Sequence, residues 1–150
     1  MKTRKIEGIA TIVTDTEFLS KRCVPWSLID QNLENNIKHL IDTANHYYNR
    51  CAGLAFNQIG ILKRGILIRS EGKYKVMINP VYIMKSPSVK ARMESCLSRP
   101  TNKPIKKRRS IKVKIEYYDW ETKEIKQEKF LGLEARIVQH EIDHLNGVLI

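Results

Sequence analysis

The chain has 150 residues, and its 27 Lys or Arg against 16 Asp or Glu give a formal net charge of +11, which favours an acidic partner such as ribosomal RNA. This length predicts a single domain, residues 1–150, which buries roughly two-thirds of its unfolded surface. Three cysteines, no basic-then-apolar leader and no apolar run long enough to span a membrane argue against a secreted or membrane protein, so we expect a soluble monomer in the reducing cytoplasm.

The first predicted helix runs from about residue 28 to residue 48. Its apolar residues recur at three- and four-residue intervals, as on one face of a helix, and Asp30 is one possible N-cap. A segment rich in small residues follows it, from Cys51 to Gly60. Small residues would let the backbone approach a ligand closely.

Two strands are predicted next, over residues 61–68 and 74–84. Pro80 interrupts the second strand, and because proline cannot donate a hydrogen bond to a sheet, it predicts an edge strand or a bulge. Residues 85–93 are predicted to form a polar loop that leads to Cys96. A free cysteine is most often a plain buried thiol, but this one could also be a soft metal ligand.

Basic residues fill five of the seven positions from 103 to 109. They form either a solvated loop with the start of a strand or a patch that contacts phosphates. Residues 111–117 alternate between apolar and charged side chains, which is the clearest strand pattern in the chain. A turn around residues 119–123 should join this strand to a partner at 124–130, in a hairpin that leads into the last helix.

The last predicted helix, from Gly132 to Asn146, contains His-Glu-Ile-Asp-His at positions 140–144. Residues four apart lie on one helical face, so His140 and His144 can point two imidazoles at one metal ion. The alternative is that two histidines and a glutamate merely share a helix. The opposite face is apolar, so the helix should run through the middle of the molecule. The predicted fold is α+β, with antiparallel sheets around this central C-terminal metal-binding helix and one N-terminal helix.

Catalytic zinc-like sites keep three protein ligands and one open position for water. The metzincin pattern would place a third histidine six residues after His144, where this chain has Ile150. Thermolysin-like proteases take a glutamate ligand from a helix well downstream of the second histidine, and this sequence offers no such helix after His144. The third ligand must therefore come from before His140, and Cys96 is the soft ligand available there.

Three blocks of sequence, in this order, resemble peptide deformylase. That family carries Gly-x-Gly-x-Ala-Ala-x-Gln, then Glu-Gly-Cys-Leu-Ser, then Gln-His-Glu-x-Asp-His-Leu-x-Gly. This chain has Cys-Ala-Gly-Leu-Ala-Phe-Asn-Gln at 51–58, Glu-Ser-Cys-Leu-Ser at 94–98 and Gln-His-Glu-Ile-Asp-His-Leu-Asn-Gly at 139–147. Few other known designs combine His-Glu-x-x-His with an upstream Cys-Leu-Ser block.

The resemblance implies a metal-dependent hydrolase that removes the formyl group from the N-terminal N-formylmethionine of nascent polypeptides. One divalent metal would be held by three ligands: Cys96, His140 and His144. Fe(II) is the expected native ion, although Zn(II), Ni(II) or Co(II) would fit the same ligands. Glu141 would act as general base on a water molecule, while the Gln58 side-chain amide and the Leu97 backbone N–H would stabilise the developing oxyanion.

The resemblance also implies supporting roles. Glu94 is expected to support the metal site and to pair with Arg108. Four residues match substrate-binding positions of the family: Leu133 and Ile137 in the methionine pocket, and Gly53 and Leu54 along the extended peptide backbone.

The chain departs from the family pattern at Cys51, Phe56, Ser95 and Arg136, none of which removes a group that does chemistry. Phe56 adds bulk behind its loop and must be matched by a smaller neighbour. Arg136 stands beside the methionine pocket at a commonly apolar position, so it should alter the width and polarity of that pocket. The short ending resembles the phage-encoded form of the family, which would act in the host cytoplasm.

Two other functions are weighed against this one. A metalloprotease that cuts ordinary peptides would share the metal chemistry, but a cysteine ligand and the lack of a downstream ligand speak against it. An inactive relative retained as a basic RNA-binding module would need a broken motif, and every catalytic group is intact.

Overall fold

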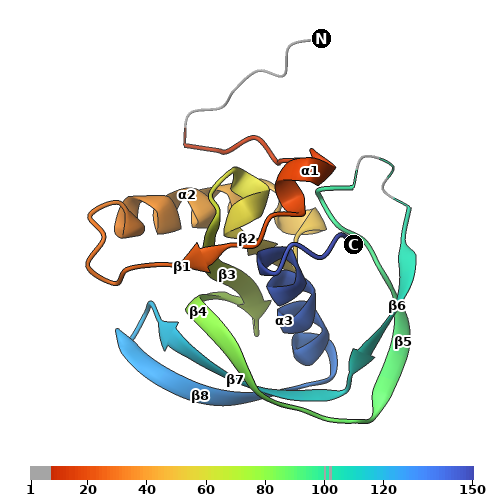
Figure 1. Ribbon diagram of the computed structural model, residues 1–150. Helices are drawn as coiled ribbons and strands as arrows, with labels where there is room; N and C mark the ends of the chain where they lie inside the picture. Colours follow the sequence, from red (N-terminus) through yellow and green to blue (C-terminus); the bar gives the residue numbers. More distant parts are fainter. Residues whose placement is uncertain (1–7, 100, 102) are drawn as a thin grey trace.

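The computed structural model describes residues 8–99, 101 and 103–150. Three α-helices are found in this part of the chain: α1 (Thr16–Leu19), α2 (Leu33–His46) and α3 (Gly132–Leu145). The strands are β1 (Val24–Pro25), β2 (Gly53–Ala55), β3 (Lys63–Ser70), β4 (Lys73–Lys85), β5 (Val89–Glu94), β6 (Ile105–Ser110), β7 (Lys112–Asp119) and β8 (Glu124–Leu131). Two 3-10 helices, η1 (Tyr48–Arg50) and η2 (Phe56–Ile59), flank β2. Figure 1 shows the strands curling around α3, with α2 beyond β2 and β3.

The larger sheet has the strand order β1-β3-β4-β7-β8, and β2 pairs with β3 beside this path. All of its pairings are antiparallel except the short parallel pairing of β1 with β3. Strands β5 and β6 form a separate antiparallel ribbon. The structure is therefore α+β, as predicted, with α1 as an additional short helix near the N-terminus.

The sheet separates two apolar cores because successive side chains of a strand point to opposite faces. On β3, Ile66 and Ile68 pack into the core that contains α3, whereas Leu67 packs into the core that contains α2. The side of α3 predicted to be apolar supplies four fully or almost fully buried residues to the first core: Ala135, Val138, Ile142 and Leu145. Burial of each large side chain contributes roughly 1.5–3 kcal/mol, so this face fixes the helix against the sheet.

The bulge predicted at Pro80 is present. The pairing of β4 with β7 shifts register between Ile78 and Val81, and Asn79 adopts a φ of 53°. Because β4 lies between β3 and β7, the alternative of an edge strand is wrong. The bulge removes the need for the hydrogen bond that proline cannot donate.

Two local predictions are wrong. Residues 85–93 are not a loop, since Val89–Glu94 forms β5 and pairs with β6 from Val89–Ser110 to Glu94–Ile105. All of its residues except Glu94 are exposed, so no alternation between buried and exposed positions marks it as a strand. Asp30 does not cap α2 either: its Oδ1 accepts from the N–H of Asn32, the actual N-cap.

Among the helices of the described residues, none is long and apolar enough to cross a membrane.

Candidate metal and catalytic site

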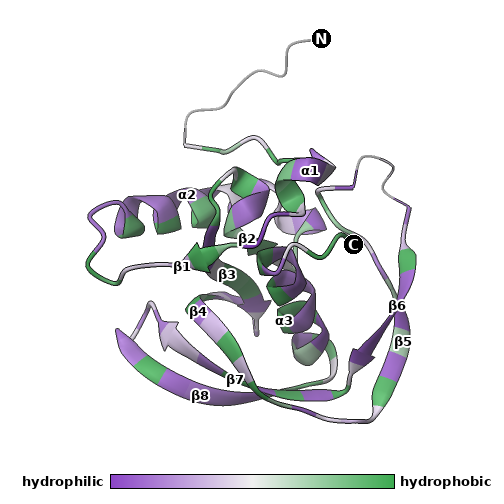
Figure 2. Cartoon of the chain, viewed as in Figure 1, coloured by the Kyte–Doolittle hydropathy of each residue, from purple (hydrophilic) through white to green (hydrophobic). Residues whose placement is uncertain are grey.

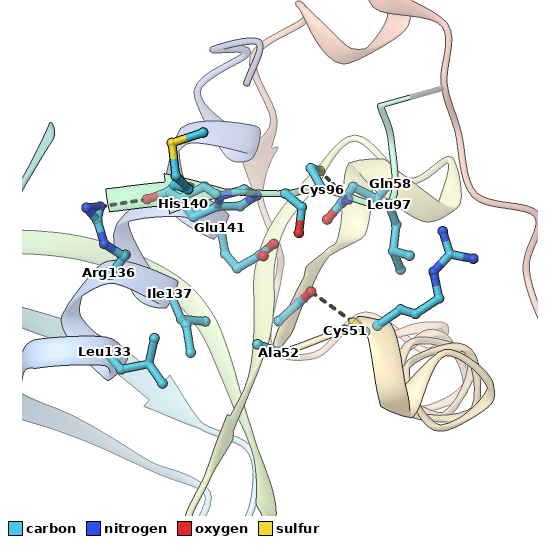
Figure 3. Close-up of a pocket in the computed structure, with 15 residues that line it drawn as sticks. Cys51, Ala52, Gln58, Cys96, Leu97, Leu133, Arg136, Ile137, His140 and Glu141 are labelled. Carbon is cyan, nitrogen blue, oxygen red and sulfur yellow. Dashed lines mark hydrogen bonds and ion pairs between the residues drawn. The ribbon is translucent and has the colours of Figure 1, made fainter. Parts of the chain in front are cut away.

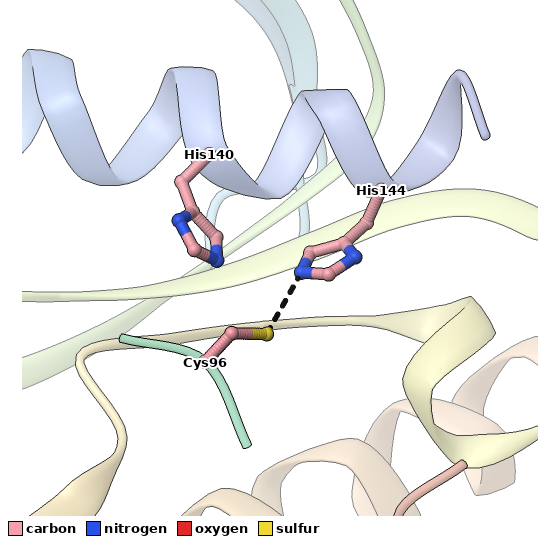
Figure 4. Close-up of side chains that lie close together, drawn as sticks. All are labelled: Cys96, His140 and His144. Atoms are coloured by element: carbon pink, nitrogen blue, oxygen red, sulfur yellow. Dashed lines mark hydrogen bonds between the residues drawn. The ribbon is translucent and has the colours of Figure 1, made fainter. Parts of the chain in front are cut away.

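Three predicted metal ligands lie together at one end of α3. Cys96 lies two residues after the end of β5, while His140 and His144 are one turn apart on the helix. Their ligand atoms all lie within 4.8 Å of one another, and Cys96 Sγ is 3.3 Å from His144 Nε2. Figure 4 shows both imidazoles turned toward the thiol. One thiol and two imidazoles, all buried, form a donor set that suits a divalent transition metal.

The Glu94 carboxylate forms a hydrogen bond with one ring nitrogen of His140. His140 Nδ1 donates to Glu94 Oε1 at 2.9 Å, which leaves Nε2 as the nitrogen available to a metal. Arg109 binds the same carboxylate through Nε and Nη2, both at 2.9 Å, and Arg136 Nη1 donates to Oε2 at 2.8 Å. Burial alone would raise the pKa of Glu94, but the hydrogen bonds and charges of His140 and Arg109 outweigh it and lower the pKa to about 2. Glu94 is therefore a fixed anion that orients the histidine.

The two imidazoles sit in different electrostatic surroundings. Burial, followed by repulsion from His140 and Arg109, lowers the pKa of His144 to about 3. A neutral imidazole is the form that binds a metal. Burial also acts to lower the pKa of His140, but its hydrogen bonds to Cys96 and Glu94 raise it overall.

Glu141 lies next to the first histidine and points into the cavity, as Figure 3 shows. Its side chain is buried, and Oε2 has no hydrogen-bond partner among the described residues. Burial raises the pKa of this carboxyl to about 7, because the charged form is poorly solvated there. A buried carboxylate oxygen without a partner, beside a cluster of metal-binding side chains, is suited to accept a hydrogen bond from water or substrate.

The predicted oxyanion donors lie at the same cavity, which measures about 240 Å³. The side chain of Gln58, on η2, is held in place because its Oε1 accepts a hydrogen bond from the backbone N–H of Ala55 at 3.0 Å. Its Nε2 donates to Ser98 Oγ at 3.1 Å and lies 3.5 Å from Cys96 Sγ. Leu97 also lines the cavity, across from Leu133 and Ile137 in Figure 3.

Three of the four predicted substrate-binding residues line this cavity: Gly53, Leu133 and Ile137. Leu133 is 72% exposed and therefore open to a ligand. A Cβ on Gly53 would lie 2.9 Å from both Glu141 Cγ and Ile137 Cγ2, so only glycine allows this close approach of β2 to α3. Leu54 does not line the cavity, because its side chain is fully buried in the core beside α2.

The predicted pairing of Glu94 with Arg108 is wrong by one residue. Arg109 makes the pair, and its Nη1 also donates to Asp143 Oδ2 at 2.6 Å. The reason is the alternation of β6, in which Arg109 points toward α3 while Arg108 points to solvent. The missed residues Arg109, Asp143 and Ser98 lie in segments that the sequence singled out, but their roles are recognisable only from their contacts.

The structure accounts for three of the four departures. The smaller neighbour expected for Phe56 is Gly65, where a Cβ would lie 2.5 Å from the Phe56 ring. The Arg136 guanidinium binds Glu94 and the backbone carbonyls of Lys90 and Lys107, although the residue still lines the cavity. The Cys51 thiol donates to the carbonyl of Gly53 at 3.0 Å. Nothing in the structure explains Ser95.

Comparison with known proteins points to one family. A family model described as polypeptide deformylase matches residues 9–150. The peptide deformylase of Thermotoga maritima is 36% identical over 132 residues, which cover 88% of this chain and 78% of that protein. The peptide deformylase of Clostridium beijerinckii is 38% identical over 143 residues, which cover 95% of this chain and 99% of that protein.

A solved structure gives the same picture. The Met-Ala-Ser-bound crystal structure of the class I type b peptide deformylase from Acinetobacter baumannii matches with a TM-score of 0.85 and 28% identity, over 94% of this chain and 95% of that one. All three proteins come from bacteria, so they lend no support to the expected phage origin.

Proposed function

The chain belongs to the polypeptide deformylase family, and from that premise we propose that it removes the formyl group from the N-formylmethionine of nascent polypeptides in a metal-dependent hydrolysis. The observation that carries the proposal is the cluster of Cys96, His140 and His144, with Glu141 beside it in the same cavity. The chain would act as one catalytic domain, residues 1–150, in which α3 is the central metal-binding helix.

The three ligands would hold one divalent ion, with Fe(II) as the expected native metal and Zn(II), Ni(II) or Co(II) as substitutes. When bound, such an ion lowers the pKa of a water molecule and makes it a nucleophile near neutral pH. Glu94 serves this site by fixing the His140 ring, through the 2.9 Å contact to Nδ1.

Glu141 takes the proton from the attacking water and passes it to the amine that leaves. Its free Oε2 and its pKa of about 7 suit a group that must both accept and donate a proton near neutral pH. As the formyl carbon becomes tetrahedral, its oxygen gains negative charge. The Gln58 Nε2 and the Leu97 backbone N–H donate to that oxygen, and Gln58 is already held in place by Ala55.

The substrate would lie as an extended strand beside β2. In the described part of the chain, β2 pairs with β3 alone, so its other edge is available to a peptide at Gly53. Leu54 can take part only through its backbone. Leu133 and Ile137 would contact the methionine side chain. The bound Met-Ala-Ser of the Acinetobacter baumannii structure is a tripeptide that begins with methionine, which fits a product of this reaction.

We also propose that the enzyme is a cytoplasmic monomer that works close to ribosomes, since its substrate exists only on new chains and its net charge of +11 favours RNA.

The direct test is formate release by protein purified without oxygen, whose metal content is measured in the same sample. We expect formate from formyl-Met-Ala-Ser and no acetate from acetyl-Met-Ala-Ser. Cleavage of internal peptide bonds would instead indicate a metalloprotease. Metal-loaded protein that releases no formate would refute the proposed function.

A further inference from the structure

The β5–β6 ribbon lies outside both apolar cores. Neither core contains a residue of these two strands, all of which the structure describes. Glu94 and Arg109 are the buried residues of the ribbon, and both are charged. Figure 2 shows β6 almost entirely hydrophilic. Hydrophobic burial therefore contributes little to the contact between the ribbon and α3, which depends on polar groups instead.

One polar stripe of α3 supplies these groups. Its members occupy positions 136, 139, 140 and 143, which lie on one helical face because they are three or four residues apart. Three members each bind one ribbon residue: Gln139 binds Ser110, His140 binds Glu94 and Asp143 binds Arg109.

The fourth member, Arg136, joins both strands of the ribbon. Its Nη2 donates to the backbone carbonyls of Lys90 on β5, at 3.0 Å, and of Lys107 on β6, at 2.9 Å. Its Nη1 donates to Glu94 Oε2 at 2.8 Å, and the side chain is only 12% exposed. A guanidinium can reach three acceptors at once because it presents five N–H donors in a rigid fork. One arginine thus holds two strands and a buried carboxylate to the helix.

The ribbon and α3 form facing parts of the catalytic cavity. Met93 and Glu94 line this cavity from β5. Leu133, Arg136 and Ile137 line it from α3, and Figure 3 shows these three on one side of the cavity. Leu133 and Arg136 also line a neighbouring cavity of about 350 Å³, so they lie between the two. The width of the proposed methionine pocket therefore depends on how closely the ribbon is held to the helix.

We propose that Arg136 is a positioning residue that sets the methionine pocket, because its guanidinium holds the β5–β6 ribbon against α3. Without it, the ribbon would move outward and the methionine side chain would lose contact with one wall. The Glu94 carboxylate would keep Arg109 and His140, so the metal ligands should stay in place. The choice of methionine rests on the proposed function, whereas the attachment of the ribbon rests on the hydrogen bonds alone.

Substrate selectivity separates this role from general damage. Arg136→Met keeps a side chain of similar length that cannot hydrogen-bond. Lys75→Met is the matched control, because it also removes one positive charge and one ion pair, and Lys75 lines neither cavity. For the metal-loaded full chain, kcat/KM is measured on formyl-Met-Ala-Ser and on formyl-Ala-Ala-Ser. The ratio of the two values does not depend on the fraction of active protein, so partial unfolding cannot change it.

We expect Arg136→Met to lower this ratio about ten-fold, mainly through a higher KM for the methionine peptide with little change in kcat. Arg136→Lys should lower it about three-fold, because one ammonium cannot replace the planar fork. Lys75→Met should leave it unchanged. A wild-type ratio in Arg136→Met would overturn the proposal. Wild-type protein that releases no formate from either peptide would instead refute the proposed function.

Hydrogen exchange tests the attachment of the ribbon without any turnover. In metal-loaded Arg136→Met, the protected amides of β5 and β6 should exchange at least about ten-fold faster than in wild type, while those of β7 and β8 stay within about two-fold. Lys75→Met should leave the exchange of the ribbon as it is in wild type. Unchanged protection of β5 and β6 in Arg136→Met would show that the other members of the stripe hold the ribbon, and the proposal would fail.

Discussion

At the scale of single residues, Glu141 is the group whose surroundings fit its proposed role most closely. It lies in the cavity beside His140 but is not one of the three clustered ligands. Glu141→Ala should therefore retain the metal while kcat falls by about 10²- to 10⁴-fold, the usual contribution of a general base. Metal content and formate release measured on the same preparation test this. Turnover near the wild-type level would exclude Glu141 as the base.

Gln58 gives a second prediction, because its amide is oriented before any substrate binds. Loss of one oxyanion donor costs about 3 kcal/mol of barrier, so Gln58→Ala should lower kcat by about 10²- to 10³-fold. Its partner Ser98 provides the control: Ser98→Ala removes only the hydroxyl that accepts from Gln58 Nε2 and should have a smaller effect. A change confined to KM in Gln58→Ala would indicate a role in binding instead.

The predictability of the site differs from residue to residue. His140, Glu141 and His144 follow from helical spacing, since one turn of α3 brings them to one face. Cys96 was reached by elimination of downstream ligands and then by the resemblance, because no local rule connects residues that far apart. Arg109 was missed in favour of Arg108, since the choice between neighbouring positions depends on which face of β6 meets α3.

At the scale of elements, the contact between Phe56 and Gly65 joins η2 to β3. A methyl group at position 65 would lie 2.5 Å from the Phe56 ring, so Gly65→Ala should destabilise the protein by about 1–3 kcal/mol through overpacking. The penalty should largely disappear when Phe56 is also replaced by Ala, which removes the ring. A double-mutant cycle by urea unfolding measures this, with an expected coupling of about 1–2 kcal/mol. Additive effects would contradict the proposed packing.

The β7–β8 hairpin depends on Asp119 at its turn. Burial would raise the pKa of this carboxyl, but hydrogen bonds from Lys126 and Thr122 outweigh it and hold the pKa below its ordinary value of 3.8. A lowered pKa stabilises the fold above the unfolded-state value, and that contribution is lost as the pH falls through the folded-state value. Asp119→Asn should therefore cost about 1–2 kcal/mol at pH 7.

The pH dependence separates this contribution from general damage to the hairpin. The difference in unfolding free energy between wild type and Asp119→Asn should shrink as the pH falls below about 3.8. Glu121→Gln, on the same turn but exposed, serves as the control and should change little at either pH. A difference that stays constant from pH 7 to pH 3 would mean that the carboxylate charge is not responsible.

Elements were predictable where one face is buried. The strand at 111–117 and the last helix carry clear periodicity because each has a side against a core. The β5 strand has no such side, so its sequence resembles a loop and only its pairing with β6 defines it.

At the scale of the whole molecule, the candidate site joins the end of β5 to α3, and its cavity extends to β2 and η2. The apolar core fixes one side of α3 against the sheet. The helix therefore stays in position although its opposite side carries polar groups. The metal would then link Cys96 to α3 across 44 to 48 residues of sequence. Such a link should make the stability of the entire chain depend on the ion.

Removal of the metal should therefore lower the melting temperature. A ligand present at about 100 times its Kd stabilises a fold by about 2.7 kcal/mol, which for this size corresponds to roughly 5–10 °C. Differential scanning fluorimetry with and without a chelator measures the shift. Cys96→Ala should abolish most of it, whereas Cys23→Ala, a buried cysteine of the core outside the site, should keep it despite a lower starting temperature. A chelator effect that survives in Cys96→Ala would show that the stabilising ion binds elsewhere.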